Sequence, residues 1–211
     1  MPVTELACLH LKTNEPLSSP INAAVIPTLQ AGLRAQASYT NRAVHLLTQI
    51  EDPSYIYILG EWDSVEQHMQ GWIPSATNQD IMGTLKDDVE VVWLQHVDFE
   101  SWTSKGIGSG DMPYNAAVVA IGRYFGSSGD KQRFEQAFTE MKEYIKTLDG
   151  PGEVCGGWRV DQEDGDREEF VVLSGSGSDE ELLAFANGAA GQVKDFLKGT
   201  EVKHASWMLA A

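Results

Sequence analysis

Cysteine is scarce in this sequence, and basic residues are outnumbered about two to one by acidic ones. The only cysteines among the 211 residues are Cys8 and Cys155, too few and too far apart for a disulfide framework or a cysteine-based zinc site. They are typical of intracellular thiols. Lys and Arg number 15 against 31 Asp and Glu, so the formal net charge is −16. This charge excludes nucleic acids and anionic membrane surfaces as partners.

Long apolar runs are also absent. No stretch approaches the roughly 20 apolar residues that span a bilayer, and the opening residues MPVTEL lack a basic region followed by an apolar one. We therefore expect no membrane association and a cytoplasmic location. Apolar residues still make up 42% of the chain, which is enough for a globular core.

Nucleotide-binding and hydrolase motifs are missing as well. The segment Gly106-Ile107-Gly108-Ser109-Gly110 lacks the third glycine spacing and the strand-to-helix setting of a dinucleotide loop. There is no phosphate-binding loop, no His-Glu-x-x-His and no Gly-x-Ser-x-Gly. The five histidines show no metal-ligand spacing, so the sequence predicts no metal site.

The chain does contain an internal repeat. Ser64-Val65-Glu66-Gln67 and Ser178-Asp179-Glu180-Glu181 both match a helix-capping box, follow an apolar run, and lie 114 residues apart. Around them, the predicted strands 5–12 and 89–97 correspond to predicted strands 116–125 and 202–209. Each half is predicted to contain strand, helix, strand, strand, helix, short helix and strand.

The repeat predicts an α+β protein made of two ferredoxin-like halves. The first helix of the second half has apolar residues from Phe134 to Leu148 at spacings of three and four. Its counterpart follows Ser19-Pro20 but contains Pro27 and Gly32, which predict an irregular helix. We place the first half at 1–100, a Gly/Ser-rich linker at 101–114 and the second half at 115–211. Each half leaves one face of its antiparallel sheet bare, and we expect the two faces to cover each other as an intramolecular barrel.

This order resembles the dimeric α+β barrel superfamily, which includes antibiotic-biosynthesis monooxygenases and stress-responsive barrel proteins. The resemblance rests on Glu51-Asp52-Pro53, on the run Tyr57 to Trp62, and on Asp63-Ser64-Val65-Glu66 with His68. It implies a dimer fused into one chain, an intramolecular pseudo-dimer that leaves a further homodimer open. Because many members act on aromatic or polyketide intermediates without metal or organic cofactor, it also implies a small hydrophobic substrate and no cofactor.

Candidate chemistry concentrates in the first half. A helix opening at Ser64 places Val65, His68, Met69 and Trp72 on one face, which we expect to point inward. At three of the four equivalent positions the second half has apolar residues, so the fold itself does not require a histidine at 68. We therefore predict an active first half and a supporting second half. His68 is the leading acid/base candidate against the alternative of a structural core histidine.

Other residues are candidates by position. His10, His45 and His96 lie on three predicted strands, each among apolar neighbours. We expect His45 and His10 to act with His68 if they converge on it, and His96 to contact substrate. The remaining predicted substrate-binding residues are Trp62, Trp72, Glu5, Glu61, Met69 and Tyr39. For the tryptophans and the tyrosine, a packing role is the stronger alternative.

Glu5 is at the strand position where a polyketide cyclase of the resembled superfamily carries a histidine. The other residues of that cyclase's site have no counterpart here, because the stretch from Trp72 to Asn78 contains neither tyrosine nor histidine. The leading hypothesis is a cofactor-independent enzyme of secondary metabolism, performing cyclisation, isomerisation or dehydration in a first-half cavity. The alternatives are a cofactor-free monooxygenase and a non-catalytic ligand-binding or scaffold protein.

Overall fold

A computed structural model describes residues 1–99, 112–145, 153–162, 167–176 and 197–211. The chain divides into two compact units, Met1–Val97 with Ala205–Ala211, and Asp98–His204. The last strand, β8, contributes residues to both. The fold is α+β, with an antiparallel sheet whose strand order is β4-β1-β3-β2-β8-β5-β7-β6. None of the helices in the described ranges combines the length and apolarity needed to cross a bilayer.

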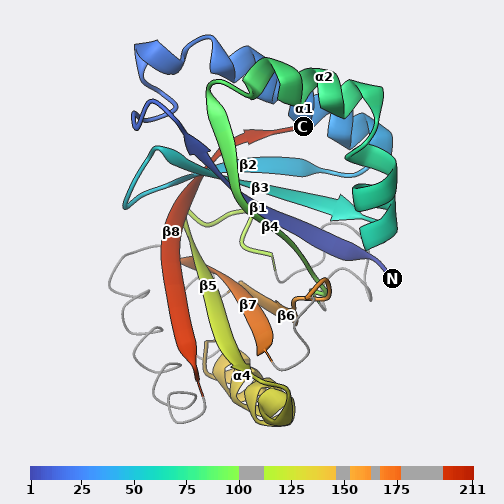
Figure 1. Ribbon diagram of the computed structural model, residues 1–211. Helices are drawn as coiled ribbons and strands as arrows, with labels where there is room; N and C mark the ends of the chain where they lie inside the picture. The colour runs from blue at the N-terminus through green and yellow to red at the C-terminus, as the bar shows by residue number, and fades with distance from the viewer. Residues whose placement is uncertain (100–111, 146–152, 163–166, 177–196) are drawn as a thin grey trace. The chain divides into compact units, whose positions relative to one another are not determined.

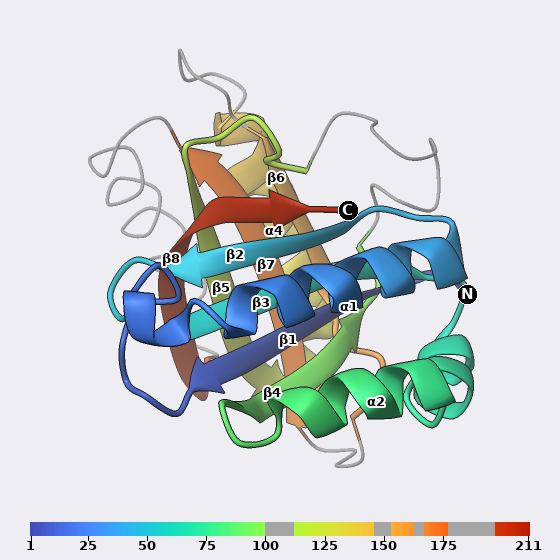
Figure 2. The same cartoon turned by 90° about the horizontal axis from the view of Figure 1, so that it is seen from above.

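The first unit places two helices on one face of its strands (Figures 1 and 2). Its elements in chain order are β1 (Val3–Leu11), a 3-10 helix (Pro20–Asn22), α1 (Val25–Thr40), β2 (Val44–Gln49), β3 (Tyr55–Trp62), a π-helix (Gln67–Trp72), α2 (Ala76–Leu85) and β4 (Val89–Val97). Strand β1 lies between β3 and β4, and β2 pairs with both β3 and the end of β8. The core beneath the helices includes Leu11, Leu33, Leu46, Ile56 and Val89.

The second unit begins with the same order of strands and helices as the first. Its described elements are β5 (Val118–Ser127), a 3-10 helix (Ser128–Asp130), α4 (Lys131–Ile145), β6 (Val154–Trp158), β7 (Arg167–Ser176) and β8 (Gly199–Ala210). Aromatic residues dominate the core between α4 and the strands, among them Tyr124, Phe134, Phe138, Trp158 and Phe170. The second predicted capping box, at Ser178, and most of the predicted linker lie outside the described residues.

The helix predicted after Ser19-Pro20 is interrupted between Asn22 and Val25, and not at Pro27 or Gly32, from which the irregularity was predicted. Ser19 precedes only the three-residue 3-10 helix, and α1 begins at Val25. Pro27 then falls in the first turn, where its missing N–H would have had no intrahelical acceptor. The helix continues past Gly32 and ends at Thr40, and the next residue, Asn41, adopts a left-handed conformation with φ of 55°.

The helix predicted from Ser64 forms, but it is a π-helix. Ser64 accepts a hydrogen bond from the Gln67 N–H at 3.2 Å, as in the predicted capping box, whereas the Gln67 side chain reaches the Asp63 N–H rather than that of Ser64. The Ile73 N–H donates to the His68 carbonyl, five residues earlier. A π-helix winds more residues into each turn than an α-helix. The short helix therefore precedes the longer α2, the reverse of the predicted order.

The inward orientation predicted for Met69 is wrong for the same reason. In the wider turn, His68 and Trp72 point to the core, with exposed fractions of 1% and 4%, while Met69 is 44% exposed. Whether the two units are repeats, and whether they close on each other as a barrel, stays a prediction.

We expect Leu46→Ala to lower the free energy of unfolding by about 2–5 kcal/mol, because the Leu46 side chain is fully buried under α1. The exposed Ile21 provides a matched control, and Ile21→Ala should change stability by less than about 0.5 kcal/mol. Urea unfolding of the two variants measures both values. Equal losses would contradict the placement of the core.

Candidate functional site

A buried cluster of polar side chains lies between the sheet and the helices of the first unit. Glu5 is at its centre, on β1, paired in register with Gly60 on β3 and His96 on β4. Because residues paired across antiparallel strands share a face, Glu5 and His96 both point to the helix-covered face. Trp62 is two residues beyond Gly60 and shares that face. The π-helix and α1 supply the remaining members.

The Glu5 carboxylate receives two hydrogen bonds on the same oxygen. Gln36 Nε2 donates to Oε2 at 2.7 Å, and Trp62 Nε1 donates to it at 2.9 Å. Gly60 makes room for this arrangement, because a Cβ there would collide with the Gln36 amide. Burial is the larger influence and raises the pKa of Glu5 above its ordinary value, against the opposing effects of the two hydrogen bonds and of nearby His96.

Two histidines extend the cluster. His68 Nδ1 is 2.7 Å from His96 Nε2, a hydrogen bond in which one nitrogen must donate and the other accept. On its other side, His68 Nε2 is 3.7 Å from Glu5 Oε2. The His68 ring stacks on Trp62, with centroids 4.1 Å apart and planes 13° apart. Glu5, His68 and His96 therefore form a continuous row of groups that can exchange protons, each at most 4% exposed.

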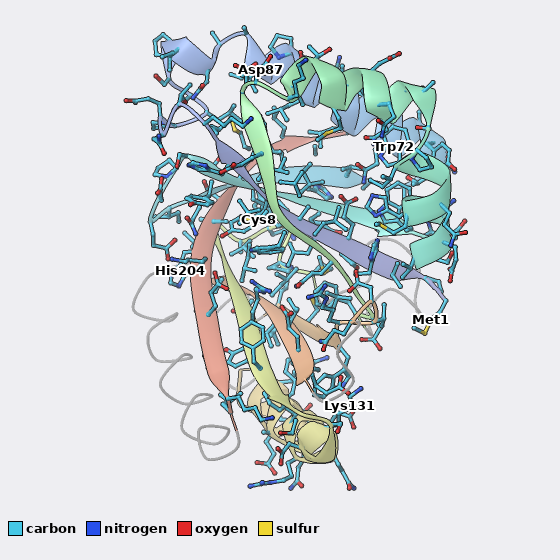
Figure 3. All side chains as sticks on the ribbon, viewed as in Figure 1. Met1, Cys8, Trp72, Asp87, Lys131 and His204 are labelled. Carbon is cyan, nitrogen blue, oxygen red and sulfur yellow. The ribbon has the colours of Figure 1, made fainter. Side chains whose placement is uncertain are left out.

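Aromatic side chains form the outer boundary of this row. Trp72, labelled in Figure 3, is 6.4 Å from Trp62 between ring centroids and 4% exposed. Tyr39 is 45% exposed and packs against both tryptophans, with centroids 6.2 Å from Trp62 and 5.4 Å from Trp72. It also lies against the π-helix, because a Cβ on Gly71 would be 2.6 Å from its hydroxyl. Tyr39 thus separates the tryptophan pair from solvent.

His10 and His45 do not lie in this row. His10 is five residues from Glu5 and His45 pairs with Leu59, so strand alternation directs both to the opposite face of the sheet. His10 contacts Glu90 at 2.9 Å, and His45 meets the Trp207 ring edge-on at 5.3 Å. Burial lowers the pKa of His45. The strand histidine brought to His68 is instead His96.

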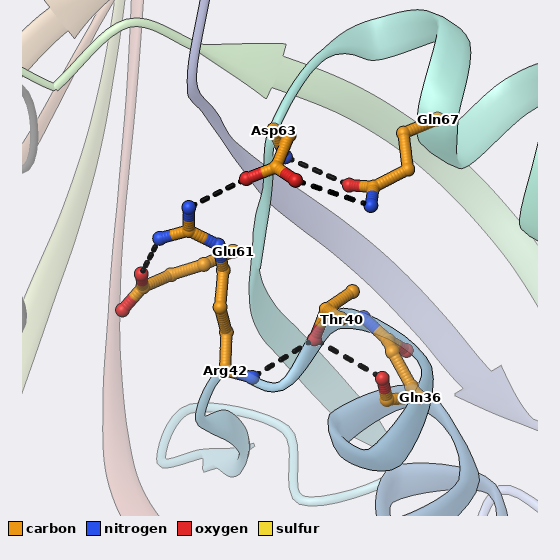
Figure 4. A network of polar contacts seen from close by, with 6 residues as sticks. All are labelled: Gln36, Thr40, Arg42, Glu61, Asp63 and Gln67. Atoms are coloured by element: carbon orange, nitrogen blue, oxygen red, sulfur yellow. Dashed lines mark hydrogen bonds and ion pairs between the residues drawn. The ribbon is translucent and has the colours of Figure 1, made fainter.

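Glu61 is also on the opposite face, held in a separate polar network (Figure 4). Arg42 donates from Nη1 to Glu61 at 3.2 Å and from Nη2 to Asp63 at 2.5 Å. Burial raises the pKa of Glu61, while the hydrogen bond from Arg42 opposes that shift. The Thr40 hydroxyl accepts a hydrogen bond from the Arg42 N–H and donates one to the Gln36 carbonyl. This network therefore fixes the end of α1 that carries Gln36.

Sequence reasoning missed Gln36 and Arg42. The sequence does contain a signal for Gln36. Val25, Leu29 and Leu33 form a buried stripe along α1 at helical spacing, and Gln36 is the next residue of that stripe. A polar side chain in such a stripe needs a buried partner. Within the described ranges, no three His, Cys, Asp or Glu side chains are arranged to hold a metal ion.

Solved structures with the same fold are numerous, although their sequences are only 8–12% identical to this one. A candidate monooxygenase of Fusobacterium nucleatum superposes with a TM-score of 0.67 at 10% identity, covering 99% of this chain and 93% of its own. An anthrone oxidase-like protein gives 0.65 at 11%, covering 99% and 92%. A candidate chlorite dismutase gives 0.68 at 8%, covering 99% and 95%.

The chain shares the fold of these proteins. The resemblance to monooxygenase-like α+β barrel proteins predicted from the sequence is thereby confirmed at the level of fold. No family model matches the sequence, and no curated protein matches it.

The burial of Glu5 predicts a pH-dependent stability. Because its folded pKa is raised, the folded state holds the proton more tightly. That contribution is complete below the ordinary pKa of 4.5 and is lost as pH rises through the folded pKa. Glu5→Gln has no group to titrate at this position. As pH rises above 4.5, the free energy of unfolding of the wild type should therefore fall relative to that of Glu5→Gln. Urea unfolding from pH 4 to pH 9 measures the difference, and a difference independent of pH would contradict the assignment.

Proposed function

We propose that this chain is an oxidative enzyme that acts on a hydrophobic aromatic or polyketide-like metabolite through proton transfer at Glu5, His68 and His96. The observation that carries the proposal is the 2.7 Å contact between His68 and His96, buried beside a carboxylate of raised pKa. A buried carboxylate of raised pKa in contact with other ionisable groups is typical of functional sites. Solved monooxygenase-like and oxidase-like proteins of the same fold favour the oxidative class.

Proton transfer along the row follows from its hydrogen bonding. If His68 carries its proton on Nδ1, it donates to His96 Nε2 and leaves its own Nε2 unprotonated and able to accept a proton. When His68 Nε2 takes a proton from substrate, the Nδ1 proton can move along this bond to His96 without water. The row can therefore act first as a base and later as an acid.

Such a base is sufficient for oxidation when the substrate is electron-rich. Removal of a proton from a methylene between aromatic rings that are conjugated to a carbonyl group, as in anthrone, leaves an enolate anion, which gives its electrons to molecular oxygen and forms a hydroperoxide. Loss of water then leaves a ketone, so that the methylene group and one oxygen molecule become a carbonyl group and one water molecule. The substrate supplies every electron, and we accordingly propose chemistry that uses neither a metal nor an organic cofactor.

The first-unit tryptophans suit a flat substrate. Trp72 lies beside Trp62, whose ring stacks on His68, and aromatic surfaces of this kind bind planar apolar ligands. Because the row is buried, we propose that substrate enters where Tyr39 meets the π-helix. Displacement of the exposed Tyr39 ring would uncover the tryptophan pair with little change to the sheet.

A second candidate is the acid/base chemistry favoured by the sequence, namely cyclisation, isomerisation or dehydration. The same row supports it, because these reactions require only proton donors and acceptors. A non-catalytic ligand-binding role is the third. Oxygen consumption distinguishes the first candidate from the second, and the absence of any product distinguishes the third.

We also propose that the two units are repeats that close as an intramolecular α+β barrel. Strand, helix, strand and strand open both units in the same order. With the repeat offset of 114 residues, Gly60 of the first unit corresponds to Ser174 of the second. Ser174 pairs with Ala120 on β5, as Gly60 pairs with Glu5 on β1. Ala120 therefore corresponds to Glu5, so the acid/base centre proposed for the first unit has no carboxylate at the equivalent position of the second.

Replacement of His68 should abolish turnover. With anthrone as the probe substrate, we expect His68→Phe and His68→Gln to lower kcat/KM by at least about 100-fold, the usual contribution of a general base. Circular dichroism checks that both variants fold. The matched control is His10→Gln, on the opposite sheet face, which should stay within about twofold of wild type. Wild-type activity in a folded His68 variant would refute the role of His68.

Removal of oxygen tests the reaction class. The wild-type protein should consume one oxygen molecule per anthrone in an oxygen electrode and give no product under nitrogen. A substrate that is converted equally well under nitrogen would favour the cyclase or isomerase alternative. In that case His68 should still be required.

A further inference from the structure

The second unit contains a cavity that has no part in the chemistry proposed above. It lies between α4 and the strands β6 and β7 and has a volume of about 500 Å³. Pockets for small molecules in proteins commonly measure about 300–1,000 Å³. Its size therefore suits a compact organic ligand.

Three aromatic rings line the inner part of this cavity. Phe138 comes from α4, Trp158 from β6 and Phe170 from β7. Phe170 meets Phe138 at 5.0 Å and Trp158 at 4.9 Å between centroids, with interplanar angles of 64° and 73°. Gly156 lets two of these rings pack against the backbone of β6, because a Cβ there would be 2.5 Å from the Phe138 ring and 2.7 Å from the Phe170 ring.

The rim of the cavity is acidic. Three carboxylates, those of Asp98, Glu135 and Glu143, line it together with a single ammonium group, that of Lys142. The whole chain has a net charge of −16, so the field of the protein as a whole has the same sign as this rim. An anionic ligand is disfavoured here, whereas a cation is attracted.

The aromatic rings already contact cationic groups of the protein itself. Lys131 Nζ lies 5.0 Å from the centroid of the Trp158 ring, and Lys142 Nζ lies 5.5 Å from that of Phe138. These are distances at which a ring face attracts a positive charge. The rings of this cavity therefore bind ammonium groups of the protein itself, and a ligand cation would compete with Lys131 and Lys142 for them.

We propose that this cavity binds a small hydrophobic organic cation, such as an aromatic amine or a quaternary ammonium compound. The apolar part of the ligand would contact Phe138 and Phe170. Its positive charge would lie over a ring face and near the carboxylates of the rim. Neither contact involves the first-unit row, so the proposal holds whichever reaction that row performs.

Benzyltrimethylammonium tests the proposal against neopentylbenzene, its neutral isostere. The 211-residue chain should bind the cation at least about fivefold more tightly, the preference expected when a cation–π contact replaces an apolar one. Isothermal titration calorimetry, with equal co-solvent for both probes, measures the two dissociation constants. Binding of the cation should weaken as salt is raised, because the rim is solvated. Equal affinities, or no binding of either probe at millimolar concentration, would overturn the proposal.

A pair of variants at Thr139 locates the site. Thr139 is an exposed cavity-lining residue of α4, and both Lys and Met are good helix formers of similar length. Thr139→Lys places an ammonium group at the cavity and should weaken binding of the cation at least about fivefold. Thr139→Met lacks the charge and should bind it within about twofold of wild type. Unchanged binding in Thr139→Lys would exclude this cavity as the site.

Discussion

Burial of the Glu5 carboxylate imposes the strongest constraint on the first unit. A buried carboxylate must receive hydrogen bonds, and here both come from side chains held by other elements, Gln36 on α1 and Trp62 on β3. The hydrogen bond fixes the plane of the Trp62 ring, against which His68 then stacks. His68, so oriented, presents Nδ1 to His96. Helix, sheet and π-helix are thus aligned around one oxygen atom.

The same constraint explains features at a distance from the carboxylate. Gly60 is required because any side chain would displace the Gln36 amide. Thr40 and Arg42 fix the end of the helix from which Gln36 extends. The π-helix turns Met69 outward while keeping His68 and Trp72 inward, so two side chains four residues apart reach the same cluster. A regular α-helix would have presented a broader apolar stripe with a different set of residues.

Much of this arrangement was predictable from periodicity. Strand alternation and the apolar runs predicted β1, β3 and β4 closely, and the divergence between the halves indicated His68 and Trp62. The sheet face to which each strand histidine points was harder to predict. It depends on the register of the strand, and a shift of one residue moves the side chain to the other face. Register paired Glu5 with His96 and placed His45 and His10 on the other face. The π-helix had no signal in the sequence, since its extra residue per turn depends on tertiary packing.

The two helix-covered faces show that the fold does not itself require a polar cluster. In the second unit, the buried residues through which α4 packs on its strands are aromatic, namely Phe134, Phe138, Trp158 and Phe170, and Glu135 and Lys131 contact Trp158 from the edge of this cluster. An apolar interface of this kind is at least as stabilising as a buried ionisable network, because it incurs no desolvation of charge. The first unit instead keeps a carboxylate whose pKa is raised by burial, so ionisation of Glu5 reduces stability at neutral pH. A group that weakens the fold when charged, and that contacts a pair of histidines able to share a proton, is better explained by chemistry than by packing.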